Sequence, residues 1–151
     1  MIGAGDAAAS LLSPALYRAF ALPYEQRICS AVHKAKGLAK LHVCGNTEHL
    51  LRDMCTVGAD LYNVDHMVSM ELAADVYGKA RKAYKGNMNP VGMLNMTPED
   101  CGKRASDYIA RFAGEQYILS CGCEIPAAVE DDVLHAFCNA RRRPSAFCAV
   151  P

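Results

Sequence analysis

The stretch Leu41–Thr47, which reads Leu-His-Val-Cys-Gly-Asn-Thr, has the pattern of a β-strand that runs into a turn. Alternate side chains of a strand share a face, so His42 and Cys44 point to one side while Leu41 and Val43 point to the other. An imidazole and a thiolate that project together from a strand end can chelate Zn²⁺. This stretch alone leaves a second interpretation open, in which both are ordinary buried residues of the core.

A second stretch, Ser120–Pro126, reads Ser-Cys-Gly-Cys-Glu-Ile-Pro and offers Cys121 and Cys123 as further ligands. Three protein ligands with an open fourth position are typical of catalytic zinc, whereas structural zinc usually has four. The residues therefore predict a zinc site that His42, Cys44 and one cysteine of the second stretch would form.

The composition is that of one globular domain of 151 residues with a formal net charge of zero. Balanced charge argues against a nucleic-acid partner, because phosphate binding needs clustered Lys and Arg. No apolar run reaches the length of a membrane span, and residues 1–17 contain no Lys or Arg, unlike a secretory signal. We therefore expect a cytoplasmic protein without a membrane partner, in which most of the eight cysteines are thiols.

Hydrophobic periodicity predicts strands that alternate with helices along the rest of the chain. Residues 1–6 are either a frayed terminus or the last part of a further strand. We expect Leu16, Phe20 and Leu12 to line one face of the first helix, and Ile28, Val32 and Ala35 to line one face of the second. The expected strands are residues 38–44, 59–65, 84–90 and 116–120, and the expected helices are residues 13–22, 23–37, 47–58, 70–82, 97–113 and 131–142.

This order predicts an α/β fold in which a helix pair precedes four parallel strand–helix units with right-handed crossovers. A (β/α)₈ barrel normally takes about 250 residues, so the chain has the length of half a TIM barrel. Polar residues follow each strand, with His42 and Cys44 after the first, Asp65 after the second and Asn87 after the third. Catalytic groups of barrel enzymes gather at that rim, which makes these residues candidates for a functional site.

Seven motifs in order resemble the C-terminal half of the uroporphyrinogen decarboxylase superfamily. The closer likeness is to its methylcobamide:coenzyme M methyltransferase branch, which belongs to methanogenesis and related methyl metabolism. On this resemblance, residues 1–151 form one partial barrel domain. The motifs are Asp6–Ser10, Leu12–Pro14, Leu22–Tyr24, His42–Thr47, Gly86–Pro90, Thr97–Glu99 and Gly122–Pro126.

The resemblance implies a zinc-dependent corrinoid:thiol methyltransferase. Zinc would be held by His42, Cys44 and Cys123, with Cys121 as a competitor for the third position. The methyl group would come from a methylated corrinoid carried by a partner protein, and the acceptor would be a small thiol such as coenzyme M. Asp65 and Asn87 would bind the substrate or support the site, and Asp6 matches a strand-end Asp of the family.

The chain departs from the family in length, since full members are roughly twice as long. A second half-barrel subunit or a homodimer would then complete the barrel. Two enzyme alternatives are a metal-free decarboxylase relative and a methyltransferase that uses tetrahydrofolate as the acceptor. A third alternative is a catalytically silent half-barrel that binds zinc or a partner subunit.

Overall fold

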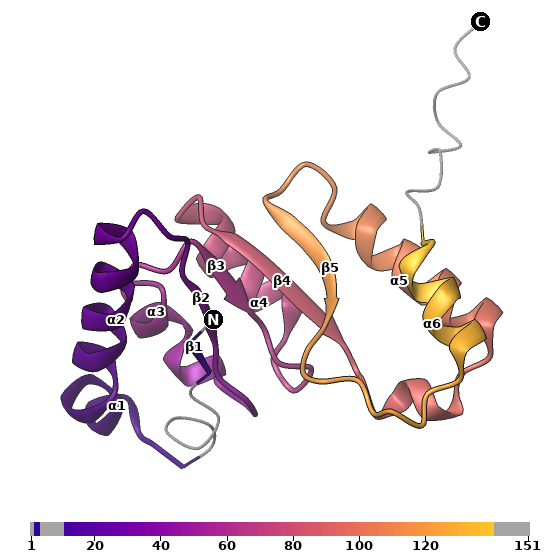
Figure 1. Ribbon diagram of the computed structural model, residues 1–151, viewed down its shortest axis with the longest axis horizontal. Helices are drawn as coiled ribbons and strands as arrows, with labels where there is room; N and C mark the ends of the chain where they lie inside the picture. The colour runs from indigo at the N-terminus through magenta and orange to yellow at the C-terminus, as the bar shows by residue number, and fades with distance from the viewer. Residues whose placement is uncertain (1, 4–10, 141–151) are drawn as a thin grey trace, which may run out of the picture.

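The computed structural model describes residues 2–3 and 11–140, which form one parallel sheet with helices packed along it (Figure 1). The strand order β1-β2-β3-β4-β5 follows the chain. The helices between successive strands pack on the face of the sheet that carries Leu41, Tyr62 and Tyr84, as in a (β/α) barrel and unlike a doubly wound sheet. The strands are β1 (Ile2–Gly3), β2 (Lys40–His42), β3 (Leu61–Asn63), β4 (Ala83–Met88) and β5 (Tyr117–Cys121).

The α/β class and the parallel strand–helix units are thus confirmed. Four strands correspond to predicted ones, and Ile2 and Gly3 form a further strand, β1, because they pair in parallel with Leu41 and His42. Among the described residues, no strand pairs with the outer side of β1 or of β5. None of the described helices is long and apolar enough to cross a membrane.

The helices begin where their capping residues predict. The hydroxyl of Ser13 accepts the N–H of Leu16, and the hydroxyl of Thr97 accepts the N–H of Asp100, so each satisfies a donor of the first turn. The helices are α1 (Pro14–Phe20), α2 (Leu22–Lys34), α3 (Leu51–Met54), α4 (Met70–Ala73), α5 (Pro98–Arg111) and α6 (Asp131–Cys138), with 3₁₀ turns at Glu48–Leu50 and Gly92–Asn95 and a π-helical turn at Ala74–Gly78.

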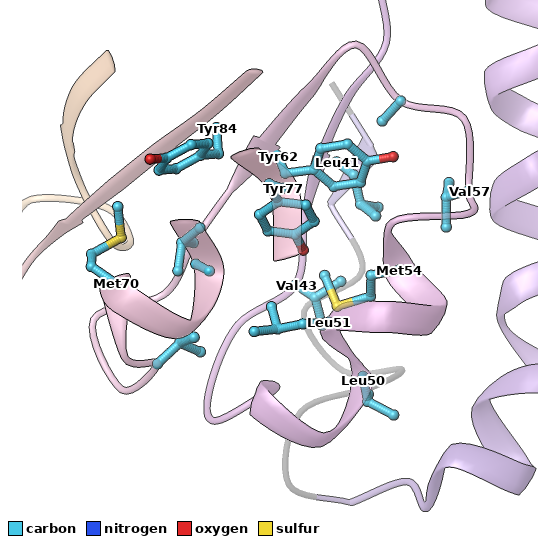
Figure 2. Close-up of a cluster of buried hydrophobic side chains, with 14 of the residues drawn as sticks. Leu41, Val43, Leu50, Leu51, Met54, Val57, Tyr62, Met70, Tyr77 and Tyr84 are labelled. Carbon is cyan, nitrogen blue, oxygen red and sulfur yellow. The ribbon is translucent and has the colours of Figure 1, made fainter. Parts of the chain in front are cut away.

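The main core lies between the helices and one face of the sheet (Figure 2). Tyr62 of β3 stacks on Tyr77 with ring centroids 4.5 Å apart, and Tyr77 in turn faces Tyr84 of β4 at 6.3 Å. Such aromatic pairs add about 0.5–1.5 kcal/mol each beyond the area that they bury. Helix α3 and its flanks bury Leu50, Leu51, Met54 and Val57 in the same core, as their spacing predicts.

The inward face predicted for α1 and α2 is wrong at three positions, although Val32 packs against the core as expected. Leu16, Phe20 and Ile28 are exposed, whereas Tyr17 and Glu25 are buried. The hydroxyl of Tyr17 donates to the Glu25 carboxylate. Because these two polar groups are hydrogen-bonded to each other, they can be buried in the core where apolar residues were expected.

Candidate metal centre

His42 and Cys44 lie at the C-terminal end of β2 and share a face, as the alternation predicts. The side chain of Val43 between them is buried in the core on the helical side. The Nε2 atom of His42 lies 3.1 Å from Sγ of Cys44. Two soft donors thus meet at the rim of the sheet.

Cys123 reaches the same point from the loop that follows β5. Its Sγ lies 3.8 Å from Sγ of Cys44, well beyond the S–S bond length of about 2.05 Å. Gly122 allows this approach, because a Cβ atom at that position would lie 2.2 Å from the backbone nitrogen of His66 in the loop after β3. The loops that follow β3 and β5 therefore touch at a residue without a side chain.

Asp65, the polar residue that follows β3, adds a carboxylate to this cluster. One donor atom each from His42, Cys44, Cys123 and Asp65 lie within 4.8 Å of one another. The carboxylate of Asp65 also accepts the N–H of Met67 at 3.0 Å, which fixes its orientation. Asp65 is buried, whereas the other three side chains are half-buried.

The donor set suits Zn²⁺ by both chemistry and spacing. Tetrahedral zinc with Zn–S bonds of about 2.3 Å holds two thiolates about 3.8 Å apart, which is the separation of Cys44 and Cys123. The same geometry requires about 3.6 Å between an imidazole nitrogen and a thiolate, so the His42 ring would move by about half an ångström to bind. Imidazole and thiolates are also the ligands that zinc prefers.

Cys121 lies elsewhere, in a second core cluster between β4, β5, α5 and α6. Its Sγ donates to Sδ of Met93 at 3.4 Å, and burial raises the pKa of its thiol to about 11. A buried thiol that resists deprotonation is a poor metal ligand. The cysteine that lies beside His42 and Cys44 is Cys123.

Asn87 supports the loop after β3. Its buried side-chain amide donates to the backbone oxygens of Asp65 at 3.0 Å and Val68 at 2.6 Å. These bonds tie the end of β4 to the segment that carries Asp65. The third expected substrate-binding residue, Asp6, lies outside the described residues.

The sequence patterns missed Asn63, which lies behind His42 on the neighbouring strand. The register of β2 and β3 sets the two residues side by side. The Asn63 amide nitrogen lies 2.8 Å from Nδ1 of His42, and the Asn63 backbone oxygen lies 3.3 Å from the same atom. Partners of this kind orient a metal-binding imidazole. Strand pairing is the only signal for this contact, because Asn63 lies 21 residues away in sequence.

A sequentially wound parallel sheet with imidazole and thiolate donors at its C-terminal rim defines a (β/α)-barrel type of protein with a candidate zinc centre. The uroporphyrinogen decarboxylase (URO-D) family model matches residues 1–144. The chain belongs to this family.

Its relatives include both decarboxylases and methyltransferases. The methylcobamide:CoM methyltransferase MtbA of Methanosarcina acetivorans is 34% identical over 116 residues, which are 76% of this chain and 33% of that protein. Uroporphyrinogen decarboxylase of Nocardia farcinica is 37% identical over 111 residues, which are 74% of this chain and 29% of that protein. The chain thus spans about a third of the length of these relatives.

The solved structure of a methyltransferase from Methanosarcina mazei has the same fold over most of this chain. The superposition has a TM-score of 0.78 at 26% sequence identity and covers 92% of this chain and 40% of that one. The resemblance to the methyltransferase branch therefore extends from sequence to structure.

Proposed function

We propose that this chain is the zinc-bearing part of a corrinoid:thiol methyltransferase. The observation that carries the proposal is the convergence of His42 Nε2, Cys44 Sγ, Cys123 Sγ and the Asp65 carboxylate within 4.8 Å at the rim of the sheet. A decarboxylation without metal needs no such set of metal-binding side chains. The cluster therefore favours the methyltransferase relatives over the decarboxylase relatives.

His42, Cys44 and Cys123 would hold the zinc, and the bound metal would keep an incoming thiol as a thiolate, the nucleophilic form. Asn63 orients the imidazole of His42, and Asn87 holds the segment that carries Asp65. The Asp65 carboxylate would then contact the thiol or the corrinoid beside the open position. Because a bound metal would lower the pKa of the incoming thiol, the thiol proton could pass to solvent without a dedicated general base.

The partners follow from the same proposal. The methyl donor is a methylated corrinoid carried by a separate protein, and the acceptor is a small thiol such as coenzyme M. Within the described part of the chain, the outer sides of β1 and β5 have no partner strand, which suits a second half-barrel subunit or a second copy of the chain. Thiolate ligands persist in a reducing compartment, which agrees with the cytoplasmic location expected from the sequence.

Elemental analysis of anaerobically purified protein tests the metal site. We expect near one zinc per chain in the wild type, and loss of zinc in Cys44→Ser and Cys123→Ser. Cys138→Ser is the matched control, because Cys138 is an exposed thiol away from the cluster. Absence of zinc after resupply, or zinc retained by Cys44→Ser, would contradict the ligand assignment.

A second measurement separates the methyltransferase from its alternatives. Co²⁺ in place of zinc gives an absorption band from thiolate ligation, and we expect coenzyme M to change this band in the wild type and not in Cys123→Ser. Methylcobalamin with coenzyme M or with tetrahydrofolate then identifies the acceptor. Metal binding without a response to any thiol would instead indicate a catalytically silent zinc-binding module.

A further inference from the structure

The face of the sheet opposite the helices carries two lysines. Leu41 and Tyr84 are fully buried against the helices, so Lys40 and Lys85, their neighbours on β2 and β4, point to the opposite face. The register aligns Lys85 with Asn63, which is itself aligned with His42. Lys85 thus lies in the same row of the sheet as a candidate metal ligand, two strands away.

The two ammonium groups lack a counter-charge within the described part of the chain. None of its ion pairs includes Lys40 or Lys85. Partial burial and the nearby charge of Lys40 lower the pKa of Lys85 below its ordinary value. Their neighbours on this face are apolar, with Leu61 and Ala83 half-buried and Ile118 52% exposed. Partial burial without a counter-charge is unfavourable for an ammonium group, so an anion that joins the pair would stabilise it.

We propose that Lys40 and Lys85 form a binding site for a compact oxyanion, such as a carboxylate, sulfonate or phosphate, on the open face of the sheet. Lys85 lies two strands away from Lys40 and two residues further along the strand direction. Their α-carbons are therefore about 12 Å apart. Each lysine has a flexible four-carbon side chain, so the two ammonium groups can both reach one oxyanion that lies between them. The oxyanion belongs either to a free small molecule or to an acidic side chain of a polypeptide that covers the face. The site does not depend on the metal.

The test uses the metal-free chain with isotope-labelled lysine and inorganic sulfate as the probe. NMR follows the side-chain signals of the lysines during a titration with sodium sulfate at constant ionic strength. We expect saturable shifts for Lys40 and Lys85, assigned from Lys40→Gln and Lys85→Gln. Lys79, which is exposed and paired with Asp75, serves as the internal control and should not shift saturably.

The variants decide whether the two lysines act together. Either Gln variant should weaken sulfate binding by about tenfold, because each removes one charge-assisted contact. Lys85→Arg keeps the charge and should retain binding, while circular dichroism checks that each variant is folded. Equal shifts at Lys79, a shift that does not saturate, or unchanged affinity in folded Lys85→Gln would overturn the proposal.

A competition experiment identifies the source of the oxyanion. Acetate and a short strand-forming peptide with one Glu are compared as displacers of sulfate, with the Gln version of the peptide as control. If the Glu peptide displaces sulfate at much lower concentration than acetate does, the site receives an acidic side chain of a covering polypeptide. Equal displacement by acetate supports a free small anion.

Discussion

The tautomer of His42 is the residue-scale feature on which the proposed metal centre depends. Zinc would bind the Nε2 lone pair, so Nδ1 must carry the proton and needs an acceptor. The backbone oxygen of Asn63 lies 3.3 Å from Nδ1, and the Asn63 amide lies closer still. The Oδ1 atom of Asn63 is buried without a hydrogen-bond partner among the described residues. Turning this amide over would bring its oxygen to Nδ1–H and give the proton a second acceptor.

Asn63→Ala should therefore weaken zinc binding by about 10- to 100-fold, the usual effect of removing such a partner of a ligating histidine. Competition with a chromophoric zinc chelator measures the affinity. The matched control is Asn139→Ala, since the Asn139 amide only donates to its own helix at the His135 carbonyl. Equal zinc affinity in wild type and Asn63→Ala would show that Asn63 plays no part in orienting the ring.

Gly122 sets the approach of the β5 loop to the cluster. Gly122→Ala should reduce zinc content, because its Cβ would meet backbone atoms of Asp65 and His66 at 2.8 Å and less, and the loop carrying Cys123 must move away. Elemental analysis of the folded variant measures this effect.

Gly114→Ala is the control, because Gly114 has a φ of +93° and a Cβ atom at this position would meet no other heavy atom within 4 Å. It should cost about 1 kcal/mol in the free energy of unfolding through backbone strain alone and keep its zinc. Full zinc content in Gly122→Ala would mean that the close approach of the loops is not needed for the site.

The sequence predicted which residues gather at the rim of the sheet better than it predicted the residues that contact them from behind. His42 and Cys44 share a face because of strand alternation, which is a local property. The choice between Cys121 and Cys123 rested on family resemblance, because spacing alone does not show which thiol enters the core. Asn63 was missed because its contact with His42 arises from strand register, which no local pattern reports.

At the scale of elements, Asp60 joins α2 to the first two inner strands. Its carboxylate accepts the N–H of Ala39 at 2.7 Å and lies 2.8 Å from Nε2 of His33 near the end of α2. The Ala39 N–H and then His33 hold the pKa of Asp60 below its ordinary value. A carboxyl group with a lowered pKa in the folded state stabilises the fold at neutral pH and loses this effect as the pH falls through that pKa.

Asp60→Asn should therefore be less stable than the wild type at about pH 7, and the difference should shrink as the pH falls below about 4, the ordinary pKa of Asp. Urea unfolding at a series of pH values measures both proteins. Asp107→Asn, a change on α5 far from this contact in sequence, should follow the wild type throughout. A gap between Asp60→Asn and wild type that stays constant with pH would rule out this role of the Asp60 charge.

The residues at which helices begin could be predicted from the sequence, whereas the lengths of the helices and the faces that they bury could not. Ser13 and Thr97 cap their helices because a side-chain oxygen meets a backbone donor three residues on, which depends only on local sequence. The helix predicted for residues 47–58 is reduced to a 3₁₀ turn and the short α3. The inward face of α1 and α2 was misjudged because the Tyr17–Glu25 bond makes a buried polar pair acceptable, and hydrophobic periodicity cannot register such a bond.

At the scale of the whole molecule, a metal in this cluster would link β2 to the loop after β5, with two strands between them. Zinc that binds only the folded chain should raise its free energy of unfolding by about 2.7 kcal/mol when free zinc exceeds the dissociation constant by about 100-fold. Thermal unfolding with buffered zinc, and again after chelation, measures the difference. Cys123→Ser should lose this stabilisation, whereas Cys138→Ser should keep it. An unchanged midpoint in the wild type after chelation would argue against a metal that bridges these segments.

The sequence by itself determined the class of fold, the order of its strands and helices, and the residue types at the rim, because strand alternation, helix capping and short connections are local. The tertiary structure decided which of these residues meet. The parallel register of the strands placed Asn63 beside His42 and placed Lys85 in the same row of the sheet. Gly122 allowed two loops that are distant in sequence to touch, so that Cys123 reached Cys44. Contacts across 79 residues arise only when the strands align and the core closes, which no single stretch of the chain encodes.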